Sequence, residues 1–331
     1  MNRQIRRAGS LTGAGLLGLS VLGSAVVVLV RSSSLQERSA RFMGLSGMSS
    51  TVALGCAAVV LLGAALVLSA GRSRWLSVIA LVSCVLAAQL SAPTLAGLVA
   101  PERSQDGTPL TVLVQNLWYR NPDLTRVARA TLDRDASVVV LLEFTPEAEK
   151  AFRDAGAARR YEYRWEQPRA FGHGIAVLSK VPFDVPVDLG LSGPSARLDL
   201  QLGGAPVVFY AVHVNSPSSI YDLPRWQADF AQLDRSVADA GPRTIVAGDL
   251  NATAGHRRFR LLLQTGDLRD AQDVGGGGFS DTWPADSWIP ALLRIDHVLV
   301  GPEIGVEAFR TLPFVGSDHL GIEAGLRVPD R

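Results

Sequence analysis

Hydrophobic and polar residues are distributed unevenly along the 331-residue chain. Three stretches of the N-terminal third, residues 8–30, 42–71 and 75–101, contain no charged side chain. After residue 101, short runs rich in β-branched residues alternate with amphipathic stretches of helical period. The pattern therefore predicts a hydrophobic N-terminal part and a larger C-terminal part of α/β type.

The N-terminal part has the length and polarity of a membrane anchor. A helix needs about 20 apolar residues to cross the hydrocarbon core of a bilayer, and charged residues are confined to the links between the three stretches. We expect residues 1–101 to form an anchor with transmembrane helices at 8–30, 45–71 and 75–100. A cleaved signal peptide is the alternative for the first stretch, but its apolar run is too long and two more follow.

Arginines around the first predicted helix indicate its orientation. Arg3, Arg6 and Arg7 precede the helix, and basic flanks favour the cytoplasmic side. Three arginines follow the helix as well, so the bias is small. With three spans the two termini lie on opposite sides, and we expect a multi-pass membrane protein whose C-terminal domain is extracytoplasmic.

A polar linker at residues 102–109 leads into a domain that we expect over residues 110–331. The expected strands are 110–115, 137–142, 174–178, 196–202, 207–212, 244–247 and 295–300. The expected helices are 123–134, 146–155, 224–240 and 256–264. A region of this length can bury one large core, with β-sheets layered against helices.

Charge and cysteine content limit the chemistry of this domain. Residues 1–101 hold eight arginines and one acid, Glu37, which leaves 24 basic and 30 acidic residues in the remainder, a net charge of −6. Nucleases of broad specificity gain affinity from basic residues on phosphates, so this charge does not favour that class. Both cysteines, Cys56 and Cys84, lie in the apolar part, so the domain has no disulfide or thiolate metal site.

Polar side chains gather where the predicted strands end. Asn116, Glu143 and His213 end or follow hydrophobic runs, and Asp249 and Asn251 follow the run at 244–247. The remaining residues of this kind are Asp296, Asp318 and His319. Strand ends are where α/β folds collect their site residues, so we expect one shared cleft.

The donor set of this cleft suits a hard divalent cation. Carboxylate and amide oxygens favour Mg²⁺, Mn²⁺ or Ca²⁺ over zinc. Two carboxylates ~4 Å apart repel by about 4 kcal/mol at an effective dielectric constant of 20. Glu143, Asp249 and Asp318 therefore need a cation or raised pKa values to share one cleft. A cation is the simpler solution, and it is a Lewis acid for phosphate oxygens.

Each of these residues also has an ordinary structural explanation. Asn116 or Glu143 alone could be a turn or helix-cap residue, and residues 248–251 alone could form a turn. His213 alone could be a packed or surface histidine. Residues 317–319 could belong to a serine-nucleophile motif, but no Gly-x-Ser-x-Gly sequence accompanies them.

The other three histidines are assigned structural roles. His173 is flanked by glycines in a predicted loop, and His256 begins a predicted helix. His297 is expected to alternate outward from Asp296 along its strand.

Seven short motifs, taken together and in their order along the chain, resemble those of the endonuclease/exonuclease/phosphatase superfamily over about residues 110 to 325. The matching stretches are 114–116 (VQN), 141–145 (LLEFT), 174–179 (GIAVLS), 213–217 (HVNSP), 248–252 (GDLNA), 294–297 (RIDH) and 316–319 (GSDH). The resemblance implies a four-layered α/β sandwich, in which two mixed β-sheets lie face to face with helices outside.

The resemblance also implies roles for the metal-binding and water-binding residues. Glu143 would bind Mg²⁺ or Mn²⁺, and Asn116 and Asp318 would assist it. Asp249 and Asn251 would orient the attacking water and hold the phosphate.

A histidine–carboxylate pair completes the machinery that the resemblance implies. His319 would be the catalytic imidazole, oriented by Asp296, and His213 would donate a hydrogen bond to the phosphate. His213 stands where apurinic endonucleases carry tyrosine, which argues against that subgroup. Trp118 stands where some members place a further acid, which weakens the case for a second metal.

The sequence therefore predicts a metal-dependent hydrolase of phosphate esters, in which water attacks phosphorus. The alternatives are a nuclease of the same superfamily and a catalytically inactive, membrane-tethered phosphate-binding domain. The substrate could be a lipid, a small molecule or a nucleic acid. Contact with membrane lipid is expected through the N-terminal helices, and no protein partner is predicted.

Overall fold

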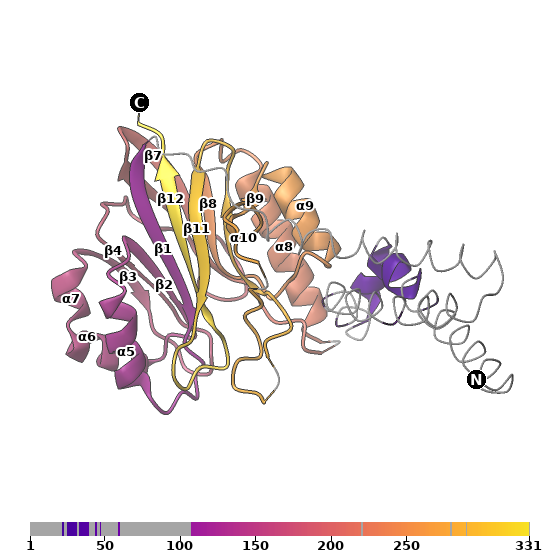
Figure 1. Cartoon of the computed structure of the whole chain (residues 1–331), viewed down its shortest axis with the longest axis horizontal. Coiled ribbons are helices and arrows are strands. Elements are labelled where there is room, and N and C mark those ends of the chain that lie inside the picture. Colours follow the sequence, from indigo (N-terminus) through magenta and orange to yellow (C-terminus); the bar gives the residue numbers. More distant parts are fainter. Residues whose placement is uncertain are drawn as a thin grey trace, which may run out of the picture. The chain divides into compact units, whose positions relative to one another are not determined.

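The computed structural model describes residues 107–219, 221–278, 280–288 and 290–330. In the N-terminal third it describes residues 22, 25–31, 33–39, 44, 47 and 59. The chain divides into two compact units, Met1–Leu95 with Gly255–Arg257 and Ala96–Ala254 with Arg258–Arg331. Every strand among the described residues lies in the second unit (Figure 1). The predicted site residues belong to the same unit.

The first unit is described only in part. Its short 3-10 helix η1, Ser34–Arg38, begins after Ser33, whose hydroxyl accepts a hydrogen bond from the backbone N–H of Leu35. The predicted spans 8–30, 45–71 and 75–100 lie almost entirely outside the described residues. No helix in the described part is long and apolar enough to cross a bilayer, so the three spans stay a prediction.

Two six-stranded mixed sheets form the second unit, in the orders β11-β12-β1-β2-β4-β3 and β5-β6-β7-β8-β10-β9. The strands of the first sheet are β1 Thr108–Asn116, β2 Val138–Leu142, β3 Tyr163–Gln167, β4 Ile175–Ser179, β11 Gly305–Leu312 and β12 Gly321–Val328. Those of the second are β5 Val187–Asp188, β6 Ala196–Leu202, β7 Ala205–His213, β8 Thr244–Asp249, β9 Arg269–Asp270 and β10 Asp296–Val300.

The two sheets share one apolar layer. Val112 and Val140 of the first sheet and Leu198, Phe209 and Ile245 of the second belong to it, and all five are fully buried. Burial of apolar surface contributes roughly 25 cal/mol per Å². Central strands are also covered on their outer faces, which is why the run Val138–Leu142 is apolar throughout rather than alternating.

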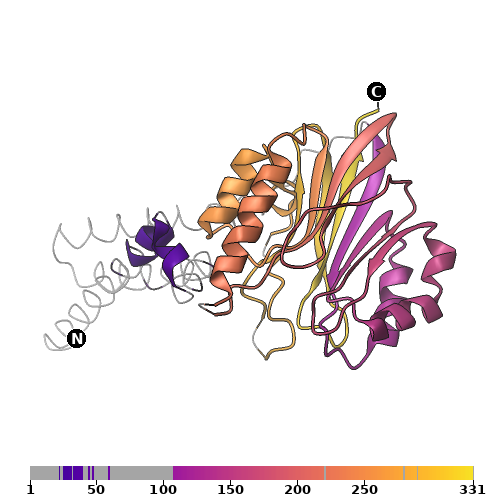
Figure 2. The same cartoon turned by 180° about the vertical axis from the view of Figure 1, so that it is seen from behind.

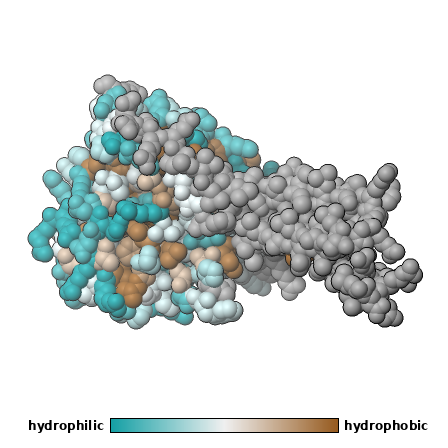
Figure 3. All heavy atoms as spheres, in the orientation of Figure 1, coloured by the Kyte–Doolittle hydropathy of each residue, from teal (hydrophilic) through white to brown (hydrophobic). Residues whose placement is uncertain are grey.

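Helices cover the outer faces of both sheets (Figures 1 and 2). The first sheet carries α5 Leu124–Asp133, α6 Pro146–Ala155 and the short α7 Ala157–Arg160. The second carries α8 Leu223–Val237 and α9 Arg257–Thr265, and the short α10 Ala271–Val274 follows β9. Hydrophilic residues gather over α5 and α6 on the side that faces solvent (Figure 3). The four-layered α/β sandwich implied by the family resemblance is confirmed.

One edge of the sandwich collects the ends of strands from both sheets. In the parallel pair β1–β2, Asn116 lies beside Leu142, so Glu143 follows at the same edge. In the parallel pair β7–β8, His213 lies beside Asp249. Strand β10 runs antiparallel to β8 and pairs Asp296 with Asp249. The topology therefore places polar residues that are distant in sequence at one edge.

Candidate active site

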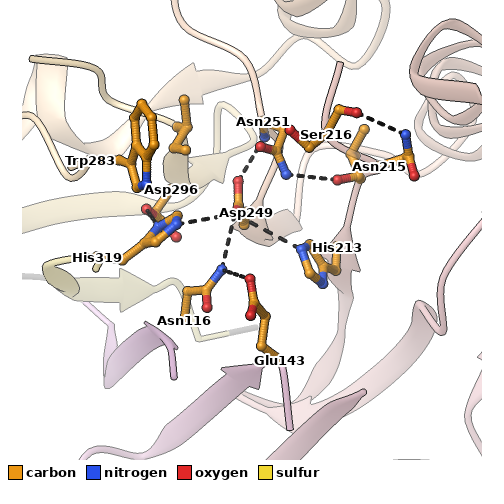
Figure 4. A network of polar contacts seen from close by, with 12 residues as sticks. Asn116, Glu143, His213, Asn215, Ser216, Asp249, Asn251, Trp283, Asp296 and His319 are labelled. Carbon is orange, nitrogen blue, oxygen red and sulfur yellow. Dashed lines mark hydrogen bonds and ion pairs between the residues drawn. The ribbon is translucent and has the colours of Figure 1, made fainter. Parts of the chain in front are cut away.

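Asn116 connects carboxylates from the two sheets (Figure 4). Its Nδ2 donates to Glu143 Oε1 and to Asp249 Oδ2, each at 3.2 Å. Its Oδ1 accepts a hydrogen bond from the backbone N–H of Trp118 at 3.0 Å. This last bond fixes the orientation of the amide, because the N–H of Trp118 requires the oxygen on that side. The buried amide of Asn116 therefore joins two acids across the gap between the sheets.

Glu143 follows β2 in a left-handed conformation, with φ of 54°. Residues other than glycine adopt this region rarely, at a cost on the order of 1 kcal/mol or more, and do so most often at functional sites. Its Oε2 accepts the backbone N–H of Tyr119 at 2.8 Å. Burial raises the pKa of Glu143, against the hydrogen bonds from Tyr119 and Asn116. The carboxylate is positioned and desolvated, and its charge is only partly compensated.

His319 links two further acids. Its Nδ1 lies 2.8 Å from Asp296 Oδ2, and its Nε2 lies 4.0 Å from Asp249 Oδ2. Burial disfavours the charged imidazole, but the carboxylates of Asp296, Asp249 and Asp318 outweigh it and raise the pKa of His319 to about 10. Burial and the nearby Asp296 carboxylate raise the pKa of Asp249. His319 is therefore an imidazolium at neutral pH, and Asp249 is more basic than an exposed aspartate.

His213 lies on the other side of Asp249, with its Nε2 4.0 Å from Asp249 Oδ2 (Figure 4). Burial and the positive charge of His319 lower the pKa of His213 to about 4. The imidazole of His213 is therefore neutral at neutral pH. Two imidazoles of different charge thus flank one aspartate, and the neutral one can donate a hydrogen bond without adding charge.

The turn after β8 holds Asp249 and Asn251 together. The backbone N–H of Asn251 donates to Asp249 Oδ1 at 2.8 Å, and its Nδ2 donates to the carbonyl of Val214 at 2.9 Å. Asn251 has a φ of 47°, a conformation that asparagine tolerates better than most residues. Before it, Gly248 cannot be replaced without strain, because a Cβ there would lie 1.8 Å from the carbonyl oxygen of Val212.

Asp318 brings a further carboxylate to the site. Its Oδ2 accepts from Trp283 Nε1 at 3.4 Å, while its Oδ1 is buried and has no hydrogen-bond partner among the described residues. Burial raises the pKa of Asp318. Ser317 connects this segment to β1, since its Oγ donates to the carbonyl of Asn116 at 2.7 Å and accepts the backbone N–H of His319 at 3.0 Å.

The acids of the site outnumber its cations. No lysine or arginine in the described part of the chain forms an ion pair with Glu143, Asp249, Asp296 or Asp318, so one imidazolium faces four carboxyl groups. Buried carboxylates in excess require raised pKa values or a bound cation. The unpartnered oxygens on Asp296 and Asp318 and the oxygen-rich donor set fit a hard divalent cation.

Two groupings of donors are possible. Ligand atoms of Asp249, Asp296 and His319 all lie within 4.8 Å of one another. One imidazolium offsets the charge of only one of the two acids in that group, and Glu143 and Asp318 have no lysine or arginine partner among the described residues. Asn116 turns its nitrogen, not its oxygen, toward Glu143, and its predicted part in metal binding stays a prediction.

A cavity of about 460 Å³ opens beside the catalytic groups, and Glu143 and His213 form part of its wall. Tyr119, Phe171 and His173 line it as well. Isolated aromatic residues and a loop histidine carry no motif, so sequence reasoning did not assign them to the site. The signal was the adjacency of residues 171–174 to the predicted strand at 174–178.

All eight predicted site residues lie at this edge, but the prediction for His297 was wrong in part. Its side chain lies opposite Asp296 on β10, as alternation predicts, yet it is fully buried rather than facing outward. Its Nδ1 lies 2.7 Å from Asp270 Oδ2, and its Nε2 lies 2.8 Å from the carbonyl of Ala252. The reason is the cover over the second sheet, where the ring of Phe259 packs 4.4 Å from the imidazole.

A model of the Endonuclease/Exonuclease/phosphatase family matches residues 113–319, more than half of the chain, and the chain belongs to this family. Together with the site, this membership identifies the protein as a hydrolase of phosphoric esters. Curated proteins give no match to the chain.

Solved structures of the same fold come from bacteria and animals. TDP2 of D. rerio, humanized by 14 mutations, is 17% identical, with a TM-score of 0.53 over 66% of this chain and 99% of that one. A family protein from Bacteroides thetaiotaomicron is 16% identical, with a TM-score of 0.54 over 68% and 99%. A third, from Beutenbergia cavernae, is 21% identical, with a TM-score of 0.51 over 67% and 72%. At these identities the likeness shows the fold alone.

The charge state of His319 can be tested directly. The neighbouring carboxylates raise its pKa, so the imidazolium persists to high pH and is lost as pH rises through that value. Asp296→Asn removes one of these charges, and the imidazole should then lose its proton about one pH unit lower or more. NMR titration of the His319 ring measures this. Asp239→Asn, an exposed site at the end of α8, is the control. An unchanged titration in Asp296→Asn would contradict the pairing.

Proposed function

We propose that the protein hydrolyses phosphate esters with the help of Mg²⁺ or Mn²⁺, by attack of water on phosphorus. The observation that carries the proposal is the convergence of Glu143 and Asp249 on the amide of Asn116, beside the charged imidazole of His319. This arrangement offers an acidic cation site and an activated carboxylate next to a fixed positive charge.

Glu143 would hold the cation with the help of Asp318, and Asn116 would assist by positioning the Glu143 carboxylate through its amide N–H. When bound, the cation supplies a Lewis acid for the phosphate oxygens. The raised pKa values of Glu143 and Asp318 support this assignment, because a cation relieves the cost of burying both charges. Asp249 orients the attacking water and accepts its proton. Its raised pKa makes it a better base near neutral pH.

His319 and His213 act on the phosphate. The His319 imidazolium, held by Asp296, stabilises the negative charge that develops as the water oxygen bonds to phosphorus. His213, uncharged, donates one hydrogen bond to a phosphate oxygen. Asn251 fixes the turn that presents Asp249 and contributes its amide to holding the phosphate.

The net charge of the domain and its predicted position at a membrane indicate the substrate class. TDP2 of D. rerio has been solved with a single-strand DNA product. In this chain the region after residue 101 has a net charge of −6, which disfavours an extended nucleic-acid surface. A predicted membrane anchor favours a phospholipid or another membrane-associated phosphate ester. The competing class is an inactive phosphate-binding domain, which the following experiments separate from an enzyme.

Activity should depend on an added divalent cation. Protein treated with EDTA is expected to be inactive on bis(4-nitrophenyl) phosphate and to recover with Mg²⁺ or Mn²⁺. Glu143→Gln should lower turnover and raise the metal concentration needed, each by about tenfold or more. Glu147→Gln, an exposed neighbour on α6, should match the wild type. Full activity in EDTA would refute the metal assignment.

Loss of either His319 or Asp249 should nearly abolish turnover. His319→Ala and Asp249→Ala are each expected to lower kcat by about 10²–10⁴-fold, with unchanged circular dichroism. Asp296→Asn should be milder, because it misorients His319 rather than removing it. Near wild-type rates in His319→Ala, combined with loss of activity in His297→Ala, would mean that the wrong histidine has been assigned.

The domain is proposed to lie outside the cytoplasm, which reporter fusions can test. An alkaline phosphatase fused to the C-terminus is active only after export, so we expect an active fusion. A green fluorescent protein at the same position is expected to be dark if exported through the Sec pathway. The reverse pair of results would place the domain in the cytoplasm and direct attention to intracellular substrates.

A further inference from the structure

The cavity beside the catalytic groups has a cationic side chain of its own. Glu143 and His213 line one part of it, and Asp222 and Arg225 at the start of α8 line another. Arg225 is the one arginine or lysine among the described residues of the wall. A ligand that reaches from the catalytic groups toward α8 therefore meets a guanidinium.

Arg225 is available to such a ligand. Its side chain is exposed, and no hydrogen bond or ion pair joins it to a described residue. Asp222, the acid three residues earlier, instead accepts hydrogen bonds from the hydroxyls of Ser218 and Ser219 at 3.2 and 2.6 Å. None of the five N–H donors of the guanidinium is bonded to a described residue. Their planar arrangement matches the oxygens of a phosphate group.

An aromatic side chain stands at the same cavity. Phe171 is 78% exposed and has a φ of 57°. Exposing a large aromatic ring and holding a residue other than glycine in this conformation both cost free energy. The next residue, Gly172, passes close to the catalytic groups, since a Cβ there would lie 3.2 Å from Glu143 Oε2. The loop thus keeps an unpacked ring beside the metal-binding glutamate, which is where a substrate ring would lie.

We propose that this cavity is a subsite for a second phosphate. The preferred substrates are phosphodiesters that carry a further phosphate one ring away from the scissile phosphorus. Arg225 binds the second phosphate, and the intervening sugar or polyol ring packs on Phe171. This inference rests on the proposed hydrolase function and narrows its substrates.

One arginine cannot hold a long polyanion, so the subsite fits a short, doubly phosphorylated ligand better than duplex nucleic acid. Two sources share this chemistry, a nucleotide and a phosphorylated polyol headgroup. Two pairs of chromogenic substrates separate them. One is thymidine 5′-(4-nitrophenyl phosphate) with and without a 3′-phosphate, and the other is 4-nitrophenyl inositol 1-phosphate with and without a 4-phosphate.

The full chain is assayed with Mg²⁺ on both pairs. We expect the second phosphate to raise kcat/KM at least tenfold in one pair, and that pair identifies the source. Arg225→Gln should abolish the preference, whereas Arg129→Gln, an exposed arginine on α5, should retain it. Absence of a preference in both wild-type pairs, or a preference that survives Arg225→Gln, overturns the subsite.

A binding measurement separates this inference from the proposed function. Calorimetry on the full chain compares thymidine 3′,5′-bisphosphate with thymidine 5′-phosphate. We expect the bisphosphate to bind at least tenfold more tightly, and Arg225→Gln to remove the difference. Phe171→Ala should weaken both nucleotides by a similar factor and keep the preference. If bis(4-nitrophenyl) phosphate is not hydrolysed, the hydrolase proposal fails, while equal binding of the two nucleotides overturns the subsite itself.

Discussion

The site depends on the amide of Asn116, which joins a carboxylate from each sheet. Glu143 and Asp249 follow or end strands of different sheets, and the amide of Asn116 donates a hydrogen bond to each carboxylate. The backbone N–H of Trp118 fixes the amide so that its nitrogen serves both acids. Ser317 then ties the segment before β12 to the same residue. Asn116 is therefore the residue through which site residues of both sheets are connected by hydrogen bonds.

The ionisable side chains around Asn116 differ in charge because their surroundings shift their pKa values in different directions. Burial raises the pKa of Asp249, while the acids near His319 keep that imidazole charged, and its charge in turn keeps His213 neutral. The result is a base, a fixed cation and a neutral donor within one cleft. With the cation site proposed at Glu143 and Asp318, these are the groups that attack of water on a phosphate ester requires.

Much of the fold followed from sequence because local signals agreed with tertiary packing. Helix α6 has the predicted bounds, since Thr145 caps its start and Gly156, with φ of 94°, ends it. Strand β12 was missed because glycines and charges interrupt its apolar run. Its Glu323 is nevertheless buried, held by Arg134 at 2.9 and 3.0 Å, a long-range pairing that no local pattern reveals.

The site residues were predictable because strand ends and motif order marked them, but their relations were not. The bridging orientation of Asn116 depends on Trp118 and on two sheets, and the left-handed turn at Glu143 follows a run that reads simply as a strand. His297 was predicted to face outward because alternation along a strand indicates which face of the sheet a side chain lies on. It does not indicate whether a helix covers that face. Its burial depends on α9, which is distant in the sequence.

The central claim is that these gathered carboxylates form a cation site, and a titration without substrate tests it most directly. Calorimetry of the purified protein with Mn²⁺ should show saturable binding that weakens as pH falls, because protons compete with the cation for the Glu143 carboxylate, whose pKa is raised by burial. Glu143→Gln should abolish the binding. Absence of saturable Mn²⁺ binding, in a protein that still hydrolyses phosphate esters, would contradict the account.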